Sequence, residues 1–201
     1  MSIKNATAVA TAPEKGHIAQ PYQAEIQIQG TADLLLNRWN DDRVALANGS
    51  SDEVEARVYR CPDGTLGIPG GYLQQAIVKA APYQRIPRFL HGDALNLYRA
   101  GIAVSTDLAS LGSDSWDYLD LRRVRIVGRN ATQTRTRPAM RAGWTAAFLV
   151  QVVLPEYIRP DDLRAALEDA GKLVGIGDFR PTFGRFALTR FALLSALPPT
   201  T

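Results

Sequence analysis

The sequence predicts an α+β domain whose core runs in the order strand, helix, strand, strand, helix, strand. Residues 24–29 alternate strictly between apolar and polar side chains, as a half-buried strand does. Residues 72–81 have apolar side chains at helical spacing, and residues 144–194 run strand, helix, glycine-rich loop, strand. A chain of 201 residues is long enough to bury the core of one such domain.

The first half of the chain contains the first strand and the first core helix. Ile26 and Ile28 form the apolar side of the strand, and the alternation resumes over residues 54–59. In the helix, Leu73, Ile77 and two alanines share one face, and the prolines at 82 and 87 end it. Short strands are expected over residues 101–105 and 118–127, whereas residues 130–142 have no apolar periodicity and predict a long loop.

The second half supplies the remaining core elements. Residues 144–154 predict a buried strand. Pro160 with two following acids predicts a helix start, Gly171 its end, and residues 183–194 the last strand. This order is that of a ferredoxin-like (RRM-like) βαββαβ core with two large insertions, one between Gly30 and Val54 and one over residues 105–142. We expect one domain over residues 21–201 after a flexible arm, residues 1–20.

Basic charge is concentrated in one segment. The net charge of the chain is +3, but residues 122–141 contain seven arginines and no acid. Arginine accounts for 19 of the 23 basic residues, and its planar, permanently charged group suits two-point contacts with phosphate. An alternative is a solvated face with scattered salt bridges. The single cysteine, Cys61, excludes an internal disulfide. We expect a soluble, cytoplasmic protein, since no apolar run is long enough to cross a membrane.

A second informative segment, residues 175–186, contains three glycines, two arginines and three phenylalanines. Glycine lets the backbone adopt positive φ and lets a phosphate or another backbone approach closely. This composition favours a surface that holds a nucleic-acid backbone. The alternative is an ordinary loop that follows a glycine-capped helix.

Two motifs resemble those of a known family. Residues 66–77, LGIPGGYLQQAI, resemble the Ile-Pro-Gly segment that opens a helix in the RAMP (repeat-associated mysterious protein) superfamily. Gly175-Ile-Gly177 followed by Phe183-Gly-Arg-Phe186 resembles that superfamily's C-terminal glycine-rich loop. The resemblance covers residues 24–194 and is strongest to the backbone subunit of CRISPR effector complexes; a compact phage or mobile-element relative would fit equally.

The resemblance implies a non-catalytic antiviral-defence subunit that binds single-stranded RNA or DNA, RNA more readily. It implies a groove across the sheet and an insertion, residues 34–52 or 105–118, that wedges between bases. Expected partners are copies of the same chain in a filament-like assembly and other effector subunits, with no membrane and no cofactor or metal. The predicted nucleic-acid-binding residues are Arg122, Arg123, Arg125, Arg129, Arg135, Arg137, Arg180, Arg185, Gly175, Gly177, Gly184 and Phe183.

Four aromatic side chains are candidates for base stacking. They are Trp39, Tyr72, Phe179 and Phe183. Trp39 follows three leucines and Phe183 begins the last strand, so a place in the core is an alternative for each.

An endoribonuclease of the same superfamily is the main alternative function. His91 followed by Asp93, or Asp33 with Asp41 and Asp42, could serve as an acid–base pair or as metal ligands. His17 lies in the expected arm, a poor place for a preorganised base. The sequence lacks the phosphate-binding motif of a nucleotide-binding enzyme. A phage structural protein is a further alternative, but that role does not require an arginine-rich segment. We predict no catalysis.

Overall fold

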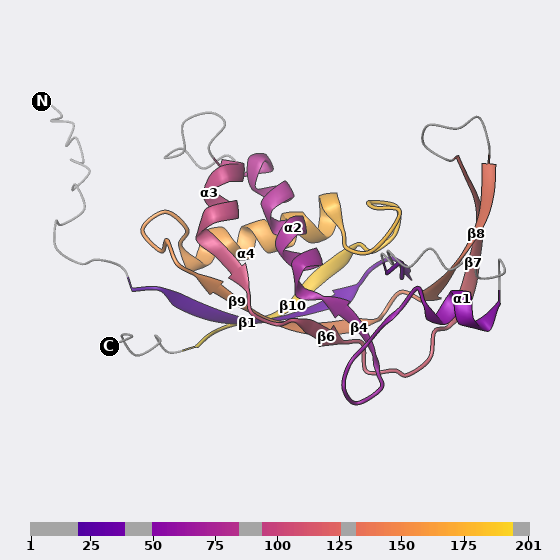
Figure 1. Ribbon diagram of the computed structural model, residues 1–201. Coiled ribbons are helices and arrows are strands. Elements are labelled where there is room, and N and C mark those ends of the chain that lie inside the picture. The colour runs from indigo at the N-terminus through magenta and orange to yellow at the C-terminus, as the bar shows by residue number, and fades with distance from the viewer. Residues whose placement is uncertain (1–19, 39–49, 85–93, 126–131, 195–201) are drawn as a thin grey trace, which may run out of the picture.

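The computed structural model describes residues 20–38, 50–84, 94–125 and 132–194 (Figure 1). The expected arm, apart from Gln20, lies outside the described residues. The structure confirms an α+β fold of antiparallel sheets and helices. No helix within the described ranges is long and apolar enough to span a membrane.

The main sheet has four antiparallel strands in the order β10-β1-β9-β5. They are β1 (Tyr22–Gly30), β5 (Ile102–Val104), β9 (Thr145–Val152) and β10 (Phe186–Leu194). In chain order, helix α2 (Gly70–Ala80) lies between β1 and β5, and helix α4 (Pro160–Asp169) lies between β9 and β10. If these four strands are numbered 1 to 4 along the chain, their order across the sheet is 4-1-3-2. This is the order that the predicted βαββαβ core requires.

Helices cover one face of this sheet and enclose the core. Figure 1 shows α2, α4 and α3 (Ala94–Gly101) above the sheet. Ile26 of β1 pairs with Phe148 of β9, and both are buried beneath the helices because alternate residues of each strand point to this side. The helices contribute buried leucines and isoleucines to the same core, among them Leu73, Ile77, Leu163 and Leu167.

Two smaller sheets, each of three strands, complete the fold. The first, in the order β2-β8-β7, consists of β2 (Leu34–Leu35), β8 (Thr132–Met140) and β7 (Tyr118–Arg125). The second, in the order β3-β4-β6, consists of β3 (Tyr59–Arg60), β4 (Leu66–Pro69) and β6 (Leu108–Ser110). In Figure 1, the β7–β8 hairpin projects at one end of the molecule, with helix α1 (Ser51–Glu55) beside it.

Three sequence predictions about elements are wrong. Residues 132–140, expected in a loop, form strand β8. Residues 54–59, expected in a strand, begin inside α1, whose N-terminus is capped by the Ser50 hydroxyl accepting from the Glu53 N–H. The last core helix does not end at Gly171 but continues through a π-helical turn, Ala170–Val174, to Gly175.

Candidate nucleic-acid interface

The β7–β8 hairpin orders part of the arginine-rich segment. Arg122 lies opposite Arg135 in the strand register, and Asp120 lies opposite Arg137. Because side chains alternate along a strand, Arg122, Arg135 and Arg137 share one face of the hairpin and Arg123 lies on the other. The hairpin therefore presents basic side chains on both faces.

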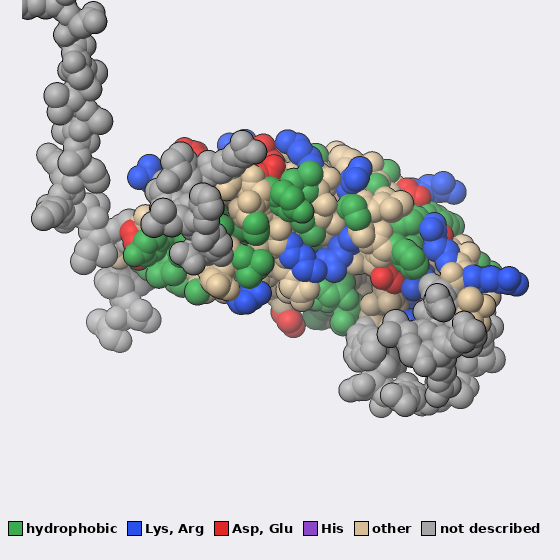
Figure 2. All heavy atoms as spheres, turned by 90° about the horizontal axis from the view of Figure 1, so that it is seen from above, with side chains coloured by type: hydrophobic (Ala, Val, Ile, Leu, Met, Phe, Trp, Pro, Cys, Tyr) green, Lys and Arg blue, Asp and Glu red, His purple; other side chains and the backbone are tan. Residues whose placement is uncertain are grey.

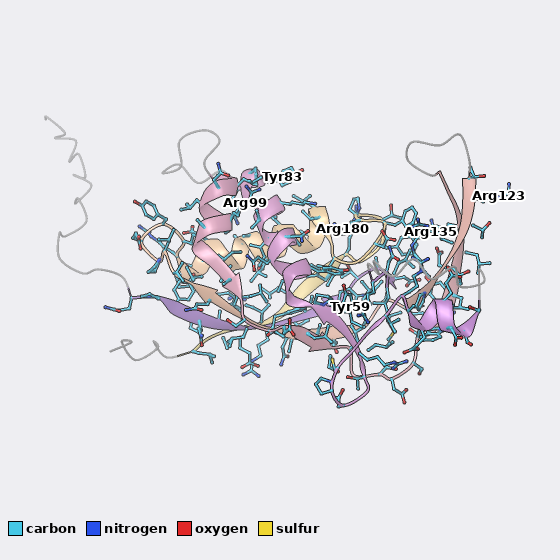
Figure 3. All side chains as sticks on the ribbon, in the orientation of Figure 1. Tyr59, Tyr83, Arg99, Arg123, Arg135 and Arg180 are labelled. Atoms are coloured by element: carbon cyan, nitrogen blue, oxygen red, sulfur yellow. The ribbon has the colours of Figure 1, made fainter. Side chains whose placement is uncertain are left out.

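The predicted arginines differ in exposure. Arg123 is exposed, and Arg135 and Arg180 are half-buried. Figure 3 shows Arg135 and Arg180 between the helices and the hairpin, and Arg123 farther out on the hairpin. The side chain of Arg125 and the whole of Arg129 lie outside the described residues. Figure 2 shows basic side chains near the middle of the helix side and at the hairpin end.

The glycine-rich loop, residues 175–185, packs against the arginine face of the hairpin. The guanidinium carbon of Arg137 lies 4.7 Å from the ring centre of Phe179. That of Arg122 lies 5.5 Å from Phe179 and 4.6 Å from Phe183. Cations and rings therefore alternate in the order Arg137, Phe179, Arg122, Phe183, which we call the arginine–phenylalanine stack. Each such contact contributes roughly 0.5–2 kcal/mol, more where water is excluded.

The three loop glycines are needed for the shape of the loop. Gly175, Gly177 and Gly184 have φ of +73°, +81° and +72°. A Cβ on Gly184 would lie 1.7 Å from the carbonyl oxygen of Ile176, and one on Gly177 would lie 2.6 Å from the Leu34 side chain. The close approach that these glycines permit is therefore to the protein's own backbone and core.

Backbone hydrogen bonds fix the loop in this place. The Ile176 N–H donates to the Gly184 carbonyl at 2.9 Å, and the Asp178 N–H donates to the Leu35 carbonyl at 3.1 Å. The Gly184 N–H donates to the Asp33 carbonyl at 2.7 Å. These donors are occupied within the protein, so side chains rather than these N–H groups are available to a ligand.

An ion pair joins the loop to the hairpin. The Nε of Arg137 donates to Asp178 Oδ2 at 2.6 Å, and the Asn37 amide donates to the same oxygen at 3.1 Å. Asn37 in turn accepts from Arg57 at 3.1 Å. Arg137 is only 4% exposed. Its Nη1 is buried and has no hydrogen-bond partner among the described residues.

This burial distinguishes Arg137 from the exposed Arg123 and the half-buried Arg135 of the same segment. Arg137 is a buried part of the loop–hairpin contact rather than an open phosphate ligand. Arg122 also has an acid, Asp120, which accepts from its Nε at 2.7 Å. Sequence reasoning missed both pairs, since Asp120 lies just outside the arginine-rich segment and Asp178 lies 41 residues from Arg137.

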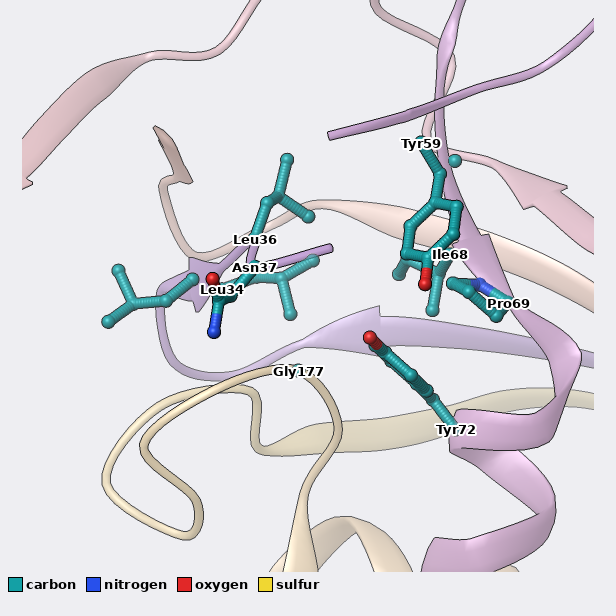
Figure 4. Close-up of a pocket in the computed structure, with 10 residues that line it drawn as sticks. Leu34, Leu36, Asn37, Tyr59, Ile68, Pro69, Tyr72 and Gly177 are labelled. Carbon is teal, nitrogen blue, oxygen red and sulfur yellow. The ribbon is translucent and has the colours of Figure 1, made fainter. Parts of the chain in front are cut away.

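The two motifs found in the sequence meet at one cleft (Figure 4). Pro69 and Tyr72 belong to the first motif and Gly177 to the second, and all three line the cleft. Its walls are mainly apolar, from Leu34–Leu36 of the β2 segment and Ile68 of β4. The cleft brings the Ile-Pro-Gly turn beside the glycine-rich loop, although about 100 residues separate them in the chain.

Two tyrosines lie at this cleft. The rings of Tyr59 and Tyr72 meet edge to face, with centres 6.4 Å apart. The guanidinium carbon of Arg38 lies 5.4 Å from the centre of the Tyr59 ring. Burial, together with the charge and hydrogen bond of Tyr59, raises the pKa of Tyr72 to about 12. Sequence reasoning missed Tyr59 and Arg38, because their place beside the motifs depends on tertiary packing.

Not every predicted site residue joins this surface. Arg185 lines a separate groove with Lys172, Glu168 and Thr31, beside strand β10. Of the stacking candidates, Tyr72, Phe179 and Phe183 are at the interface, with Phe179 38% exposed. Trp39 lies outside the described residues.

The residues proposed for catalysis are placed only in part. Both carboxylate oxygens of Asp33 accept hydrogen bonds, from the Tyr118 hydroxyl at 2.7 Å and from the Ala142 N–H at 2.8 Å. Asp33 thus ties the hairpin to the main sheet. His17, His91, Asp41, Asp42 and Asp93 lie outside the described residues. Across the ranges that the structure describes, no group of three or more His, Cys, Asp or Glu side chains could hold a metal ion.

The uncovered face of the main sheet has a different character. On β1 it presents alternate polar residues, Gln23, Glu25, Gln27 and Gln29. On β9 it presents Ala147, Leu149 and polar neighbours, and Arg190 of β10 lies 3.7 Å from Glu25. The residues of these strands thus offer no aromatic platform on that face. The basic and aromatic groups gather instead at the hairpin end.

The sequence matches no family model and no curated protein. The fold does match solved structures. A chain in the cryo-EM structure of the type III-B Cmr-beta complex bound to cognate target RNA superposes with a TM-score of 0.56 at 12% identity, over 87% of this chain and 61% of that chain. Cmr6 from Pyrococcus furiosus gives a TM-score of 0.49 at 9% identity, over 87% of this chain and 100% of that chain.

The first of these likenesses shows that this chain shares its fold with a chain of that type III-B complex. The present chain spans 61% of the length of that subunit.

Proposed function

We propose that this chain is a RAMP-like protein with a ferredoxin-like core that binds single-stranded RNA. The observation that supports this most is the convergence of both motifs on one cleft, next to the arginine–phenylalanine stack. One solved structure that shares its fold is of a complex bound to cognate target RNA. Guanidinium groups suit the phosphates, and exposed rings suit the bases, of a single strand.

In this proposal the strand lies at the hairpin end rather than across the open sheet face. Arg123, Arg135 and Arg180 contact phosphates, whereas Phe183, at the end of the arginine–phenylalanine stack, stacks on a base. Because such contacts reach every nucleotide alike, binding has little sequence preference. The projecting β7–β8 hairpin replaces the segments named from the sequence as the part that wedges between bases.

We also propose that copies assemble head to tail along the strand, in contact with other effector subunits. Exposed apolar side chains lie at both ends of the molecule. Leu119 and Leu121 of β7 are 41% and 65% exposed, and Val153 and Tyr157, after β9, are 43% and 50% exposed. Complementary patches at opposite ends give an open, head-to-tail assembly rather than a closed dimer.

The experiment that tests RNA binding is fluorescence anisotropy with labelled single-stranded RNA over a series of salt concentrations. Affinity should fall steeply with salt, by a slope of about 0.7 for each phosphate that the protein neutralises. The double variant Arg135→Gln with Arg180→Gln should flatten the slope by about 1.4.

The matched control removes equal charge elsewhere. Arg164 on α4 and Arg190 on β10 pair with Glu168 and Glu25, away from the proposed surface. Arg164→Gln with Arg190→Gln should leave the slope unchanged. Equal effects of the two double variants would remove the hairpin end from the site, and absence of binding at low salt would overturn the proposed function.

A further inference from the structure

The Tyr59 and Tyr72 hydroxyls lie together at the cleft where the two motifs meet. Tyr59 comes from β3 and Tyr72 from the first turn of α2. Figure 4 shows both hydroxyls directed into the space that faces Asn37 and Leu36. Asn37 is already bonded to Asp178 and Arg57, so the two phenol groups are the polar groups of this cleft best placed to meet a ligand.

The cleft can accept only a small part of a ligand. Its cavity volume is about 10 Å³, which is room for about one water-sized group such as a hydroxyl. Pockets that enclose a whole small molecule have roughly 300–1,000 Å³. Apolar side chains of Leu34, Leu36, Ile68 and Pro69 form most of the wall. A hydroxyl-bearing edge of a larger molecule therefore fits better than a nucleobase.

An arginine side chain lies near each of the two tyrosines. The Arg38 guanidinium lies over the Tyr59 ring at 5.4 Å. Arg180 is close enough to Tyr72 to lower its pKa, although burial and Tyr59 raise that pKa more strongly. In a nucleic-acid strand each sugar lies between two phosphates. A guanidinium group near each tyrosine suits those phosphates.

We propose that the Tyr59–Tyr72 hydroxyl pair recognises the 2′-hydroxyl of one ribose, so that the chain binds RNA more tightly than DNA of the same sequence. This inference rests on the proposed function, because it assigns the sugar class of the strand at the same surface. The 2′-hydroxyl is both donor and acceptor, and a phenol hydroxyl can meet either need.

The protonation of Tyr72 is consistent with this geometry. The raised pKa of Tyr72 keeps its proton in place at every pH where RNA is handled, so the phenol remains a donor. A deoxyribose in the same place leaves the tyrosine hydroxyls without a ligand partner in an apolar cleft. An unmade hydrogen bond of this kind corresponds to a loss of about tenfold in affinity.

The test compares oligoadenylate and oligodeoxyadenylate strands of equal length by anisotropy at one salt concentration. The wild-type protein should bind the RNA about tenfold more tightly. Tyr59→Phe with Tyr72→Phe should bring the ratio close to one by weakening RNA binding while DNA binding stays the same. Each change removes one oxygen, and the thermal unfolding midpoint verifies that the variant is folded.

Tyr83→Phe is the matched control, because Tyr83 is 64% exposed and lies outside the cleft. This variant should keep the wild-type ratio. A strand of 2′-fluoro-RNA, which lacks the hydroxyl, should bind as DNA does. If it binds as RNA does, sugar conformation and not the hydroxyl is recognised, and the inference is wrong.

The remaining outcomes separate the two proposals. Equal affinity of the wild type for RNA and DNA would overturn the inference and leave single-strand binding intact. A preference for RNA that persists in the double variant would overturn the assignment to these tyrosines. Absence of binding to either strand would overturn the proposed function itself.

Discussion

Arg137 shows how one side chain can support a binding surface without touching the ligand. It is buried, bonds Asp178 through Nε, and lies under Phe179 at 4.7 Å. The ion pair with Asp178 and the contact with the Phe179 ring offset the cost of removing the guanidinium group from water. Exposed Arg123 and half-buried Arg135, on the same two strands, have the character that phosphate contacts need.

Replacement of Arg137 should therefore affect stability before binding. Arg137→Gln removes a charged hydrogen bond to Asp178 and should lower the free energy of unfolding by about 1.5–3 kcal/mol. Urea denaturation measures this loss. Arg135→Gln, two residues away on the same face, should change stability by about 0.5 kcal/mol or less. A stable Arg137→Gln variant would contradict the structural role.

Sequence reasoning found these residues by composition and could not separate their roles. The seven arginines look alike in the chain, and only the register of β7 with β8 places some inward and others outward. The acid that pairs with Arg137 comes from the glycine-rich loop, which no local pattern links to the hairpin.

At the scale of elements, the glycine-rich loop is a packed structure with defined backbone geometry. Gly184 has φ +72°, and its missing Cβ makes room for the Ile176 carbonyl. The loop in turn holds Phe179 and Phe183 against the hairpin. Any side chain at Gly184 must displace backbone, which moves the rings of the stack.

Gly184→Ala should thus destabilise the protein by about 1–3 kcal/mol or more, from the φ conflict and the overlap. It should weaken RNA binding as well. The control is Gly71→Ala, in the first turn of α2, where a Cβ meets nothing within 4 Å. That change should stabilise by about 0.5–1 kcal/mol, since alanine is a better helix former. The thermal unfolding midpoint should fall for Gly184→Ala and rise for Gly71→Ala. An unchanged midpoint for Gly184→Ala would show that the loop does not pack this way.

Two elements escaped prediction for physical reasons. In strand β8, threonines alternate with Gln133, Arg135 and Arg137, so neither side of the strand shows the aliphatic residues by which a buried strand is identified. The residue that packs against Phe179 is an arginine, Arg137. Helix α1 had a capping signal in Ser50 and Glu53, three residues apart, which the apparent alternation of Val54 and Val58 concealed. The core strands were predictable because aliphatic side chains cover one side of each.

At the scale of the whole molecule, tyrosines link the layers. Tyr118 donates to Asp33 and joins the hairpin to the main sheet, and Tyr22 donates to the Ile158 carbonyl. Burial first, and the bond to Asp33 second, raise the pKa of Tyr118 to about 12. Burial, followed by the charges of Tyr98 and Asp161, raises that of Tyr22, and burial raises that of Tyr72.

These shifts predict an alkaline loss of stability. A phenol whose pKa is higher in the folded state than in the unfolded state stabilises the fold fully below the unfolded pKa of about 10 and loses this contribution as pH rises toward the folded value. The free energy of unfolding should be flat from about pH 7 to 9 and fall between about pH 10 and 12. Tyr118→Phe should make the fall shallower in urea titrations, and an unchanged profile would contradict this cause.

The order of the core strands and helices could be predicted from the sequence. The spacing of apolar residues and the glycines and prolines that end each element are local properties of the chain. The site followed only in outline. Its two motifs were visible, yet Tyr59 and Arg38 reach the cleft only through tertiary packing. On the uncovered face, β1 and β9 present no ring that could stack on a base in the expected groove across the sheet.

In the proposed function, single-stranded RNA lies on the hairpin end, between the arginine–phenylalanine stack and the tyrosine cleft. Ultraviolet cross-linking of bound RNA, followed by mass spectrometry of the linked peptides, tests this placement. We expect links to Phe179, Phe183, Tyr59 or Tyr72, which fade with rising salt. Links confined to the open sheet face, at Gln23–Gln29 or Ala147–Gln151, would contradict it.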